Sequence, residues 1–529
     1  SRLRWLEEHG CNFLDEEARR IDEVQARLPE WNAESATSAA RSLEGRSGRV
    51  ETVRDATVFD GVPISQIVET ALEHTRRPFG EFADHQPFEG LVRDQPRRAL
   101  LGLSWAVRRG EHPTSLWGSV VREWPDGAPA RATRFFCERL RRLPGEVITA
   151  NAHVVSSWMR DKLPAIATYD EPFALMVFDD LLNRLIAGGA QTTESGIGDT
   201  SIGGRTVERS RRTVDHAINA PIGHATEALI SILSARNLSE GHGIPQEFAT
   251  RLERLLAAPG EGTDHTVCLL AQQLPWLHYI APDWVAARML PWFALGHPAS
   301  EPAWNGLFHG GSIVGPDLFE IIKAPFLELF PEVYNWQWDN DVFRQAHVWL
   351  IMTTIWHQDE SRYTSIEEAS AAMRSLSENG RIDVIHHLGR VGQDNEDGWS
   401  GLAIPILRDI WPREARYQTE RAAAAFLSML DDSGDAFPMV LDAVRDYLRP
   451  IRQQHHSFYR FHRAVAGDEE PITSHFPAET LDLMDLIVPD DPREVPYDLG
   501  EVLTLISEIR PDLIRDRKFL RLQELLAAR

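Results

Sequence analysis

The chain has 529 residues, of which 43% are hydrophobic and 25% are charged, as in an ordinary globular protein. Its formal net charge of −24 argues against general nucleic-acid binding, and it contains no apolar run long enough to predict a membrane span. Three cysteines far apart in sequence (Cys11, Cys137 and Cys268) do not form a disulfide framework, so we expect a reducing, cytoplasmic compartment. The sequence begins with Ser1, which fits one piece of a longer polypeptide, and no signal-peptide core follows.

The first third of the chain carries charged amphipathic helices and one Gly-rich loop. We expect a helix over Ser1–Leu28, an irregular linker over 29–63 and a loop over Pro87–Pro96. A polar loop over Gly188–Arg205 has too many glycines to pack, so we predict that it is mobile. The helices predicted here are Ile64–His74, Arg97–Arg109, Thr114–Glu123, Pro129–Arg142, Gly145–Asp161 and Pro172–Ile186.

The remainder continues as short helices joined mostly by short loops, which favours antiparallel neighbours. The predicted helices are Val207–Asn219, Ile222–Arg236, Pro245–Ala257, Asp264–Gln273, Pro282–Phe293, Pro316–Phe330, Asn340–Trp356, Ser365–Ser377, Ile382–Arg390, Ser400–Ile410, Thr419–Leu430, Phe437–Leu448, Pro477–Ile487, Leu499–Glu508 and Arg517–Ala528. The first two of these read as an antiparallel pair.

The segment Thr263–Trp356 holds eight of the sixteen tryptophans. Within Asn340–Trp356, one apolar stripe contains Val342, Ala346, Trp349, Thr353 and Trp356. A second stripe beside it contains Phe343, His347, Leu350 and Thr354. A helix that is apolar on two adjacent stripes is covered on more than one side. The segment therefore reads as a central core layer, without reactive groups of its own.

No stretch shows sustained apolar and polar alternation, so the fold class predicted is all-α. A series of this length is too long for one bundle and favours an α-solenoid of degenerate HEAT-like helical hairpins. Two or three irregular helical domains are the alternative. The segments expected are 1–63 (helix and linker), 64–206 (N-terminal layer with the Gly-rich loop), 207–395 (Trp-rich central layer) and 396–529 (C-terminal layer).

The sequence contains no nucleotide-binding, phosphate-binding or zincin motif, and it offers no catalytic residue that can be chosen without geometry. The acidic run Gln393–Gly398 departs from a calcium loop at its first position, and Ile404 replaces the last ligand. The histidine pairs lack a completing ligand for zinc. We therefore predict no metal and no cofactor in this chain.

Arginine is concentrated between Arg93 and Arg142, where eleven arginines meet five acidic residues. In so acidic a chain, this patch is the best electrostatic candidate for a partner surface. Intramolecular pairing with the acidic remainder is the alternative. The candidate partner-binding residues lie at the ends of predicted helices and are Arg97, Arg98, Arg108, Arg109, Arg139, Arg141 and Arg142.

Four packing and turn motifs resemble a known family. They are Pro87–Leu91 with Pro96–Leu100, Pro221–Leu229, Trp276–Trp284, and Leu290–Phe293 with Ala303–Phe308. Together they resemble the long helical region that follows a sirtuin-like domain in certain bacterial antiphage defence proteins. The resemblance implies that the sirtuin-like part hydrolyses NAD when infection is sensed. It also implies that the helical part acts as sensor, scaffold or oligomerisation surface.

The chain itself has no sirtuin motif, so no active-site residue of the family transfers to it. The function expected is a non-catalytic scaffold that binds a protein partner, such as a phage protein, or associates with itself. It would thereby control an attached sirtuin-like NAD hydrolase. The alternatives are a stand-alone hydrolase with a site between helical layers, and a nucleic-acid-binding scaffold that uses the Arg93–Arg142 face. We expect no membrane partner.

Overall fold

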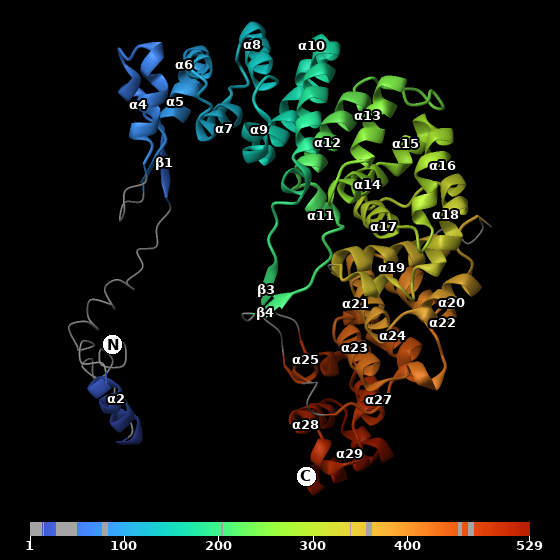
Figure 1. The fold of residues 1–529 in the computed structure, drawn as a ribbon. Coiled ribbons are helices and arrows are strands. Elements are labelled where there is room, and N and C mark those ends of the chain that lie inside the picture. The colour runs from blue at the N-terminus through green and yellow to red at the C-terminus, as the bar shows by residue number, and fades with distance from the viewer. Residues whose placement is uncertain are drawn as a thin grey trace. The chain divides into compact units, whose positions relative to one another are not determined.

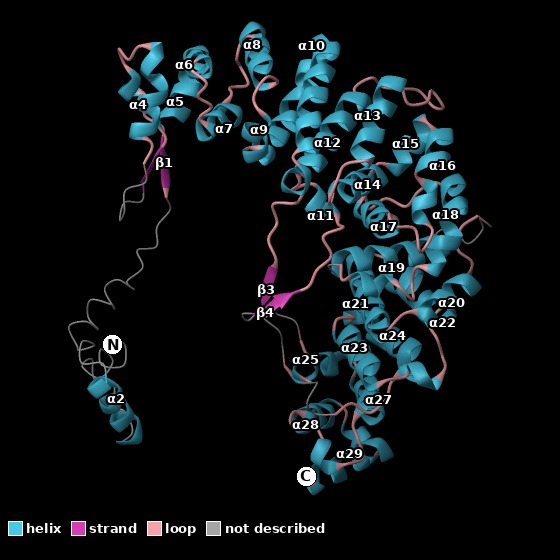
Figure 2. Cartoon of the chain, viewed as in Figure 1, coloured by secondary structure: helices cyan, strands magenta, loops and turns pink. Residues whose placement is uncertain are grey.

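The structure is almost entirely helical, which confirms the all-α class (Figures 1 and 2). It is a computed structural model. The residues that it describes are 13, 15–27, 50–76, 83–202, 205–338, 340–355, 362–452, 458–463 and 470–529. Most of the predicted linker 29–63 and the position of Trp356 fall outside these ranges. None of the helices within them combines the length and apolar character that crossing a bilayer requires.

The chain divides into two compact units, Ser1–Phe136 and Cys137–Arg529. The division falls within one helix, α8 (Ala130–Leu140). The boundaries expected from sequence at 63, 206 and 395 do not coincide with it. At 206 the reason is visible, because the helices before and after this position, α10 and α12, pack extensively against each other.

The N-terminal unit is built from short helices whose starts are set by proline. Pro87 and Pro96 each occupy the first turn of a helix, where the missing N–H costs nothing. The prediction of a loop over Pro87–Pro96 is therefore wrong, since Pro87 begins one helix and Pro96 the next. The elements are α2 (Asp15–Arg27), β1 (Glu51–Val53), α4 (Ile67–His74), β2 (Ala83–His85), α5 (Pro87–Asp94), α6 (Pro96–Arg108), α7 (Thr114–Glu123) and α8, with single 3-10 turns at Thr57–Phe59 and Ile64–Gln66.

Strands β1 and β2 form a short parallel pair, with Glu51 opposite Ala83 and Val53 opposite His85. The sequence predicted no strands, and strands of three residues give no periodic signal to find. The unit closes over a small aromatic core. Its largest buried side chains include Phe59, Phe88 and Trp117.

The C-terminal unit contains helices that pack mainly on near neighbours in sequence. Successive contacts link α10 to α12, α12 to α14, α14 to α17, α17 to α19, α19 to α21 and α21 to α23. The helices are α9 (Gly145–Ala150), α10 (Ala152–Ala187), α11 (Val214–Ala217), α12 (Pro221–Ser234), α13 (Gln246–Leu256), α14 (Gly262–Gln272), α15 (Leu274–Ile280), α16 (Pro282–Arg288), α17 (Ser300–His309), α18 (Pro316–Glu328), α19 (Asn340–Ile355), α20 (Ile366–Ser375), α21 (Glu378–Asp394), α22 (Ile404–Asp409), α23 (Glu420–Asp431), α24 (Phe437–Val444), α25 (Tyr459–His462), α26 (Ile472–His475), α27 (Pro477–Ile487), α28 (Leu499–Ile509) and α29 (Arg517–Ala528).

Several predicted helix bounds are wrong. The helix expected to end at Asp161 continues to Tyr169, and the break expected before Pro172 lies at Asp170, whose non-helical backbone angles divide α10 into two segments. Pro172 disfavours helical geometry just before it. The expected helix Val207–Asn219 shrinks to the single turn α11, and its first residue belongs to a strand. The sequence analysis also missed α17, which contains Asn305.

The tryptophan-rich segment forms a buried core in part. Trp292, Trp304, Trp338 and Trp349 are buried, whereas Trp276, Trp284 and Trp336 are half-buried. Trp304 is fully buried, stacks on Phe308 and donates its indole N–H to the Phe293 carbonyl at 3.0 Å. Phe308 makes an edge contact with Trp349 of α19, at a centroid separation of 5.5 Å. Both predicted stripes of α19 are buried over most of their length, as expected for a helix covered on more than one side.

The Gly-rich segment 188–205 is packed in its first half, so the prediction that it is too polar to pack is wrong there. Thr192 and Thr193 are fully buried, and the Ser195 N–H donates to the Glu261 carboxylate at 3.1 Å. That carboxylate also accepts from Arg211, which in turn donates to the Ile197 carbonyl. Beyond it, β3 (Thr200–Ile202) and β4 (Arg205–Val207) form an antiparallel pair. The Gly-rich segment is thus held by Glu261, which lies 66 residues after Ser195 in the sequence.

Helices α14 and α17 approach so closely that only glycine fits at Gly306. A Cβ built there would lie 2.0 Å from the Cys268 carbonyl oxygen. We expect Gly306→Ala to lower the free energy of unfolding by about 1–3 kcal/mol, because the helices must separate to admit the methyl group. Gly145→Ala is the matched control, since no atom lies within 4 Å of its Cβ position. Urea denaturation followed by circular dichroism measures both variants, and equal midpoints for the two would contradict the expectation.

Candidate partner-binding groove

Two buried carboxylates, Glu89 and Glu123, form ion pairs with three arginines of the N-terminal unit. The side chain of Glu89 is 5% exposed and accepts from Arg54 at 2.9 Å and from Arg122 at 3.1 Å. The side chain of Glu123 is 7% exposed and pairs with Arg54 and Arg93. Hydrogen bonds between two charged groups are short and strong, and removing one partner leaves the other charge buried alone. These three arginines are therefore committed to the fold.

The four predicted partner-binding arginines of the N-terminal unit have different environments. Arg98 donates to the carbonyls of Phe59 and Val62, each at 2.7 Å, and so holds α6 against the turn before it. Arg109 pairs with Glu111 at 3.0 Å. Arg97 and Arg108 are exposed, and neither has a hydrogen-bond or ion-pair partner within the described residues.

The other three predicted arginines belong to the C-terminal unit and are engaged there. Arg141 pairs with Asp180 at 2.6 Å and with Glu138 at 3.4 Å, and Arg142 pairs with Glu138 at 3.2 Å. Arg139 is also partnered. The alternative of intramolecular pairing thus describes these three residues, whereas Arg97 and Arg108 keep the charge that a partner could use.

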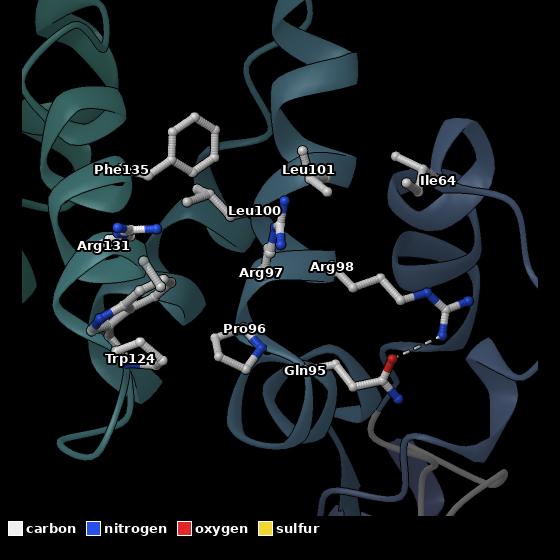
Figure 3. Close-up of a pocket in the computed structure, with 12 residues that line it drawn as sticks. Ile64, Gln95, Pro96, Arg97, Arg98, Leu100, Leu101, Trp124, Arg131 and Phe135 are labelled. Atoms are coloured by element: carbon white, nitrogen blue, oxygen red, sulfur yellow. Dashed lines mark hydrogen bonds between the residues drawn. The ribbon is translucent and has the colours of Figure 1, made fainter.

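A hollow of about 780 Å³ opens between α6 and α8 and includes Arg97 (Figure 3). In this view Arg131 of α8 lies on the side facing α6, with Phe135 on one side of it and Trp124 on the other. We call this hollow the α6–α8 groove. Its lining residues are Ile64, Gln95, Pro96, Arg97, Arg98, Leu100, Leu101, Trp124, Pro129, Arg131, Ala132 and Phe135.

The lining of the α6–α8 groove contains three arginines and no carboxylate. Arg131, like Arg97, is exposed and has no hydrogen-bond or ion-pair partner within the described part of the chain. Two hollows of the C-terminal unit differ in this respect, because their arginines face acids of the same hollow. One holds Glu253 and Asp264, and the other holds Asp409 and Glu414.

An exposed stripe on α6 extends the groove along the helix. Arg97, Leu101, Trp105 and Arg108 lie three or four residues apart and so share one side of the helix. Trp105 is 43% exposed, which is unusual for the largest apolar side chain. Large aromatic and arginine side chains are the residues most enriched where protein surfaces bind each other.

Sequence reasoning identified Arg97 and Arg98 of the groove and missed the residues that complete it. Arg131 and Phe135 lie four apart on α8, so a helical wheel places them on one face. Trp124 lies in the connection between α7 and α8 and forms a buried wall of the groove, 5% exposed. Nothing in the sequence indicates that α6 and α8 face each other.

The buried histidines of the C-terminal unit are the candidate bases for a hydrolase. Ser156 and His224 form the arrangement nearest to a nucleophile with its base, with Oγ 2.9 Å from Nδ1. The other ring nitrogen of His224 lies 2.9 Å from the Ile218 carbonyl, which fixes the tautomer. Burial lowers the pKa of His224 to about 4. Ser156 is fully buried, so a substrate has no access to its hydroxyl.

Two further buried histidines sit in closed surroundings. His347 is fully buried, and its Nε2 lies 3.0 Å from the Tyr334 hydroxyl oxygen. Burial lowers the pKa of His347 to about 3. His265 lies 3.6 Å from Glu261, and burial again dominates, lowering its pKa to about 4. Within the described residues, no three histidine, cysteine or acidic side chains gather as a metal site would need.

Comparisons with known proteins give one relative of unknown role. Over 507 residues the chain is 20% identical to an uncharacterized protein, y4cA, of Sinorhizobium fredii (strain NBRC 101917 / NGR234). The alignment covers 92% of this chain and 39% of that protein, so the chain spans about two fifths of its relative's length. No protein-family model and no solved structure matches the chain.

Arg97 and Arg98 are adjacent in sequence, but we expect only Arg98 to stabilise the fold. We expect Arg98→Gln to lower the free energy of unfolding of the N-terminal unit by about 2–3 kcal/mol, because two charge-assisted hydrogen bonds to part-buried carbonyls are lost. Hydrogen–deuterium exchange should show the loss of protection between residues 56 and 68. Arg97→Gln is the matched control and should leave exchange unchanged. The same loss in both variants would contradict the assignment.

His347 should make the C-terminal unit less stable in acid. Its pKa is about 3 in the fold and near 6.5 in an unfolded chain, so below pH 6.5 the unfolded state binds the extra proton. His347→Leu removes this penalty. The stability of the wild type relative to His347→Leu should therefore fall by about 3 kcal/mol between pH 7 and pH 4. Urea midpoints measured across this range test it. Phe343→Leu, a core change without a titrating group, should differ from the wild type by a constant amount.

Proposed function

We propose that this chain is a non-catalytic helical scaffold that binds a protein partner through the α6–α8 groove and controls an attached effector. The effector proposed is a sirtuin-like NAD hydrolase acting in antiphage defence. Partner binding would favour the arrangement in which the effector is active, as a ligand shifts a population that already exists. The serial helix packing of the C-terminal unit supports an α-solenoid of degenerate HEAT-like hairpins as its finer description.

The observation that carries the proposal is the chemistry of the groove. Its lining joins apolar side chains with Arg97 and Arg131, whose charges no described residue neutralises. Trp105 stands exposed along the same helix. Such a surface stabilises a complex by burying aromatic anchors and pairing charges, and it requires no reactive group.

Two observations support an attached effector and a role without chemistry in this chain. The relative y4cA continues well beyond the region that aligns, so in that protein a region of this kind is joined to further sequence. The buried Ser156–His224 pair, which comes nearest to a catalytic arrangement, is closed to solvent. We propose a sirtuin-like NAD hydrolase as the effector because the chain resembles helical regions that follow sirtuin-like domains.

The purified chain should leave NAD unchanged, and it should not hydrolyse generic esters or phosphoesters. In cells that express the full coding sequence, phage infection should lower NAD. The double variant Arg97→Glu, Arg131→Glu should suppress that fall while the protein accumulates normally. NAD measured by enzymatic cycling reads out both experiments, and Arg142→Glu, which changes an arginine outside the groove, is the matched control.

Turnover by the pure chain that Ser156→Ala abolishes would overturn the scaffold proposal in favour of a hydrolase. An NAD fall that persists in the double variant would show that the groove is not the controlling surface. No fall of NAD in infected cells with the wild type would remove the sirtuin-like effector from the proposal.

A further inference from the structure

We propose that the α6–α8 groove takes an amphipathic, acidic helix of a partner protein. The proposal rests on the function proposed above and names the kind of partner. The occupant would place apolar side chains on the groove floor. Its carboxylates would meet Arg97 and Arg131, the two cations that no described residue neutralises.

The length of the exposed stripe fits a helix of about three turns. Arg97 and Arg108 lie eleven residues apart on α6, which is about 16 Å along the helix axis. Leu101 and Trp105 lie between them and are accessible. A helix of about 11–15 residues laid along this stripe repeats its apolar side chains every three or four residues, in step with these two contacts.

Charge complementarity determines that the partner helix is negatively charged. The groove lining has three arginines and no acid, and Arg98 is the one already held by carbonyl groups. Two guanidinium groups on facing helices, with no partner in the described part of the chain, repel each other until a carboxylate lies between or beside them. A planar guanidinium binds a carboxylate through two parallel hydrogen bonds, so glutamate or aspartate on the occupant would be oriented as well as attracted.

The apolar floor indicates why the occupant is amphipathic. Leu101 and Phe135 line the groove beside the arginines and are half-buried, while Leu100 is fully buried and Trp124 forms a buried part of the wall (Figure 3). A carboxylate alone would leave the exposed parts of Leu101 and Phe135 in water, whereas a leucine or aromatic side chain would remove them from water. Side chains of this kind, seated at the centre of a contact and surrounded by polar groups, supply most of the affinity in protein interfaces.

Nucleic acid suits this surface less well. Single strands bind along tracks of cations and stack their bases on exposed rings. Here Arg54, Arg93 and Arg122 are neutralised by Glu89 and Glu123, which leaves few free cations. Trp124 is 5% exposed, so of the two tryptophans only Trp105 offers a face on which a base could stack. A protein helix needs only the two pairings and the apolar floor.

The probe is a labelled 15-residue synthetic helix with leucine on one face and glutamate on both flanks, mixed with the full chain. Fluorescence anisotropy should show binding, which Arg97→Glu with Arg131→Glu should weaken at least tenfold. A peptide with lysine in place of glutamate should bind the wild type at least tenfold more weakly and should regain affinity for the double variant. A peptide with serine in place of leucine should bind neither. This reversal separates charge pairing from damage to the fold.

Equal binding of the glutamate and lysine peptides to the wild type would overturn the proposal, and so would failure of the glutamate peptide to bind. Binding of a labelled single-stranded DNA at the same ionic strength, lost in the double variant, would overturn it in favour of nucleic acid. The amphipathic helix α2, whose Val24 is 56% exposed, is the internal occupant to test against. A gain in peptide affinity of more than tenfold on Ile21→Ser with Val24→Ser would assign the groove to α2 instead.

These outcomes differ from those that test the function. If the glutamate peptide fails to bind but the groove variant still suppresses the NAD fall in infected cells, the groove controls the effector through a partner of another kind. If the peptide binds but NAD does not fall, the occupant is assigned correctly and the effector is not.

Discussion

The N-terminal unit depends on two carboxylates that are taken out of water, Glu89 on α5 and Glu123 at the end of α7. A buried carboxylate is costly unless cations and hydrogen bonds surround it, and three arginines from separate elements do so here. Because Arg54 reaches both acids, the pairing joins the strand β1 side of the unit to α5 and α7. This network forms the support against which α6 packs.

The same network determines which arginines remain available. Between Arg93 and Arg142 eleven arginines meet five acids. The fold therefore pairs its two buried carboxylates with arginine and still leaves Arg97 and Arg131 without a partner among the described residues. Neither of the two acids can turn toward the groove without abandoning a buried pair. The positive charge of Arg97 and Arg131 in the groove therefore follows from the pairing of Glu89 and Glu123 with other arginines.

The sequence predicted the parts of this picture that local periodicity controls. The 3.6-residue spacing located α6, α7, α12 and α19, and the paired stripes of α19 foretold its burial. Periodicity failed where a distant residue decides the structure. The acid Glu261 packs a segment that reads as a loose loop, and Gly306 allows a helix crossing in a place where the sequence shows only Asn-Gly. The sequence located two arginines of the groove but could not distinguish Arg97 from Arg98, since the difference lies in partners that only the fold brings to Arg98, above all the carbonyls of Phe59 and Val62.

The acidity of the whole chain shapes how such a groove would work. Residues 1–136 contain 19 basic and 22 acidic groups, so most of the net charge of −24 belongs to the C-terminal unit. An acidic helix approaching this protein is repelled at long range and attracted only near Arg97 and Arg131. Salt screens charges beyond about 8 Å at physiological ionic strength, so it weakens the repulsion more than the contact pairs. Affinity therefore comes chiefly from the apolar floor, while the two arginines choose which helices are accepted. An apolar helix without acidic residues removes water from the two guanidinium groups and offers them no hydrogen bond in return. A helix whose carboxylates pair with both arginines avoids this cost and adds two ion pairs.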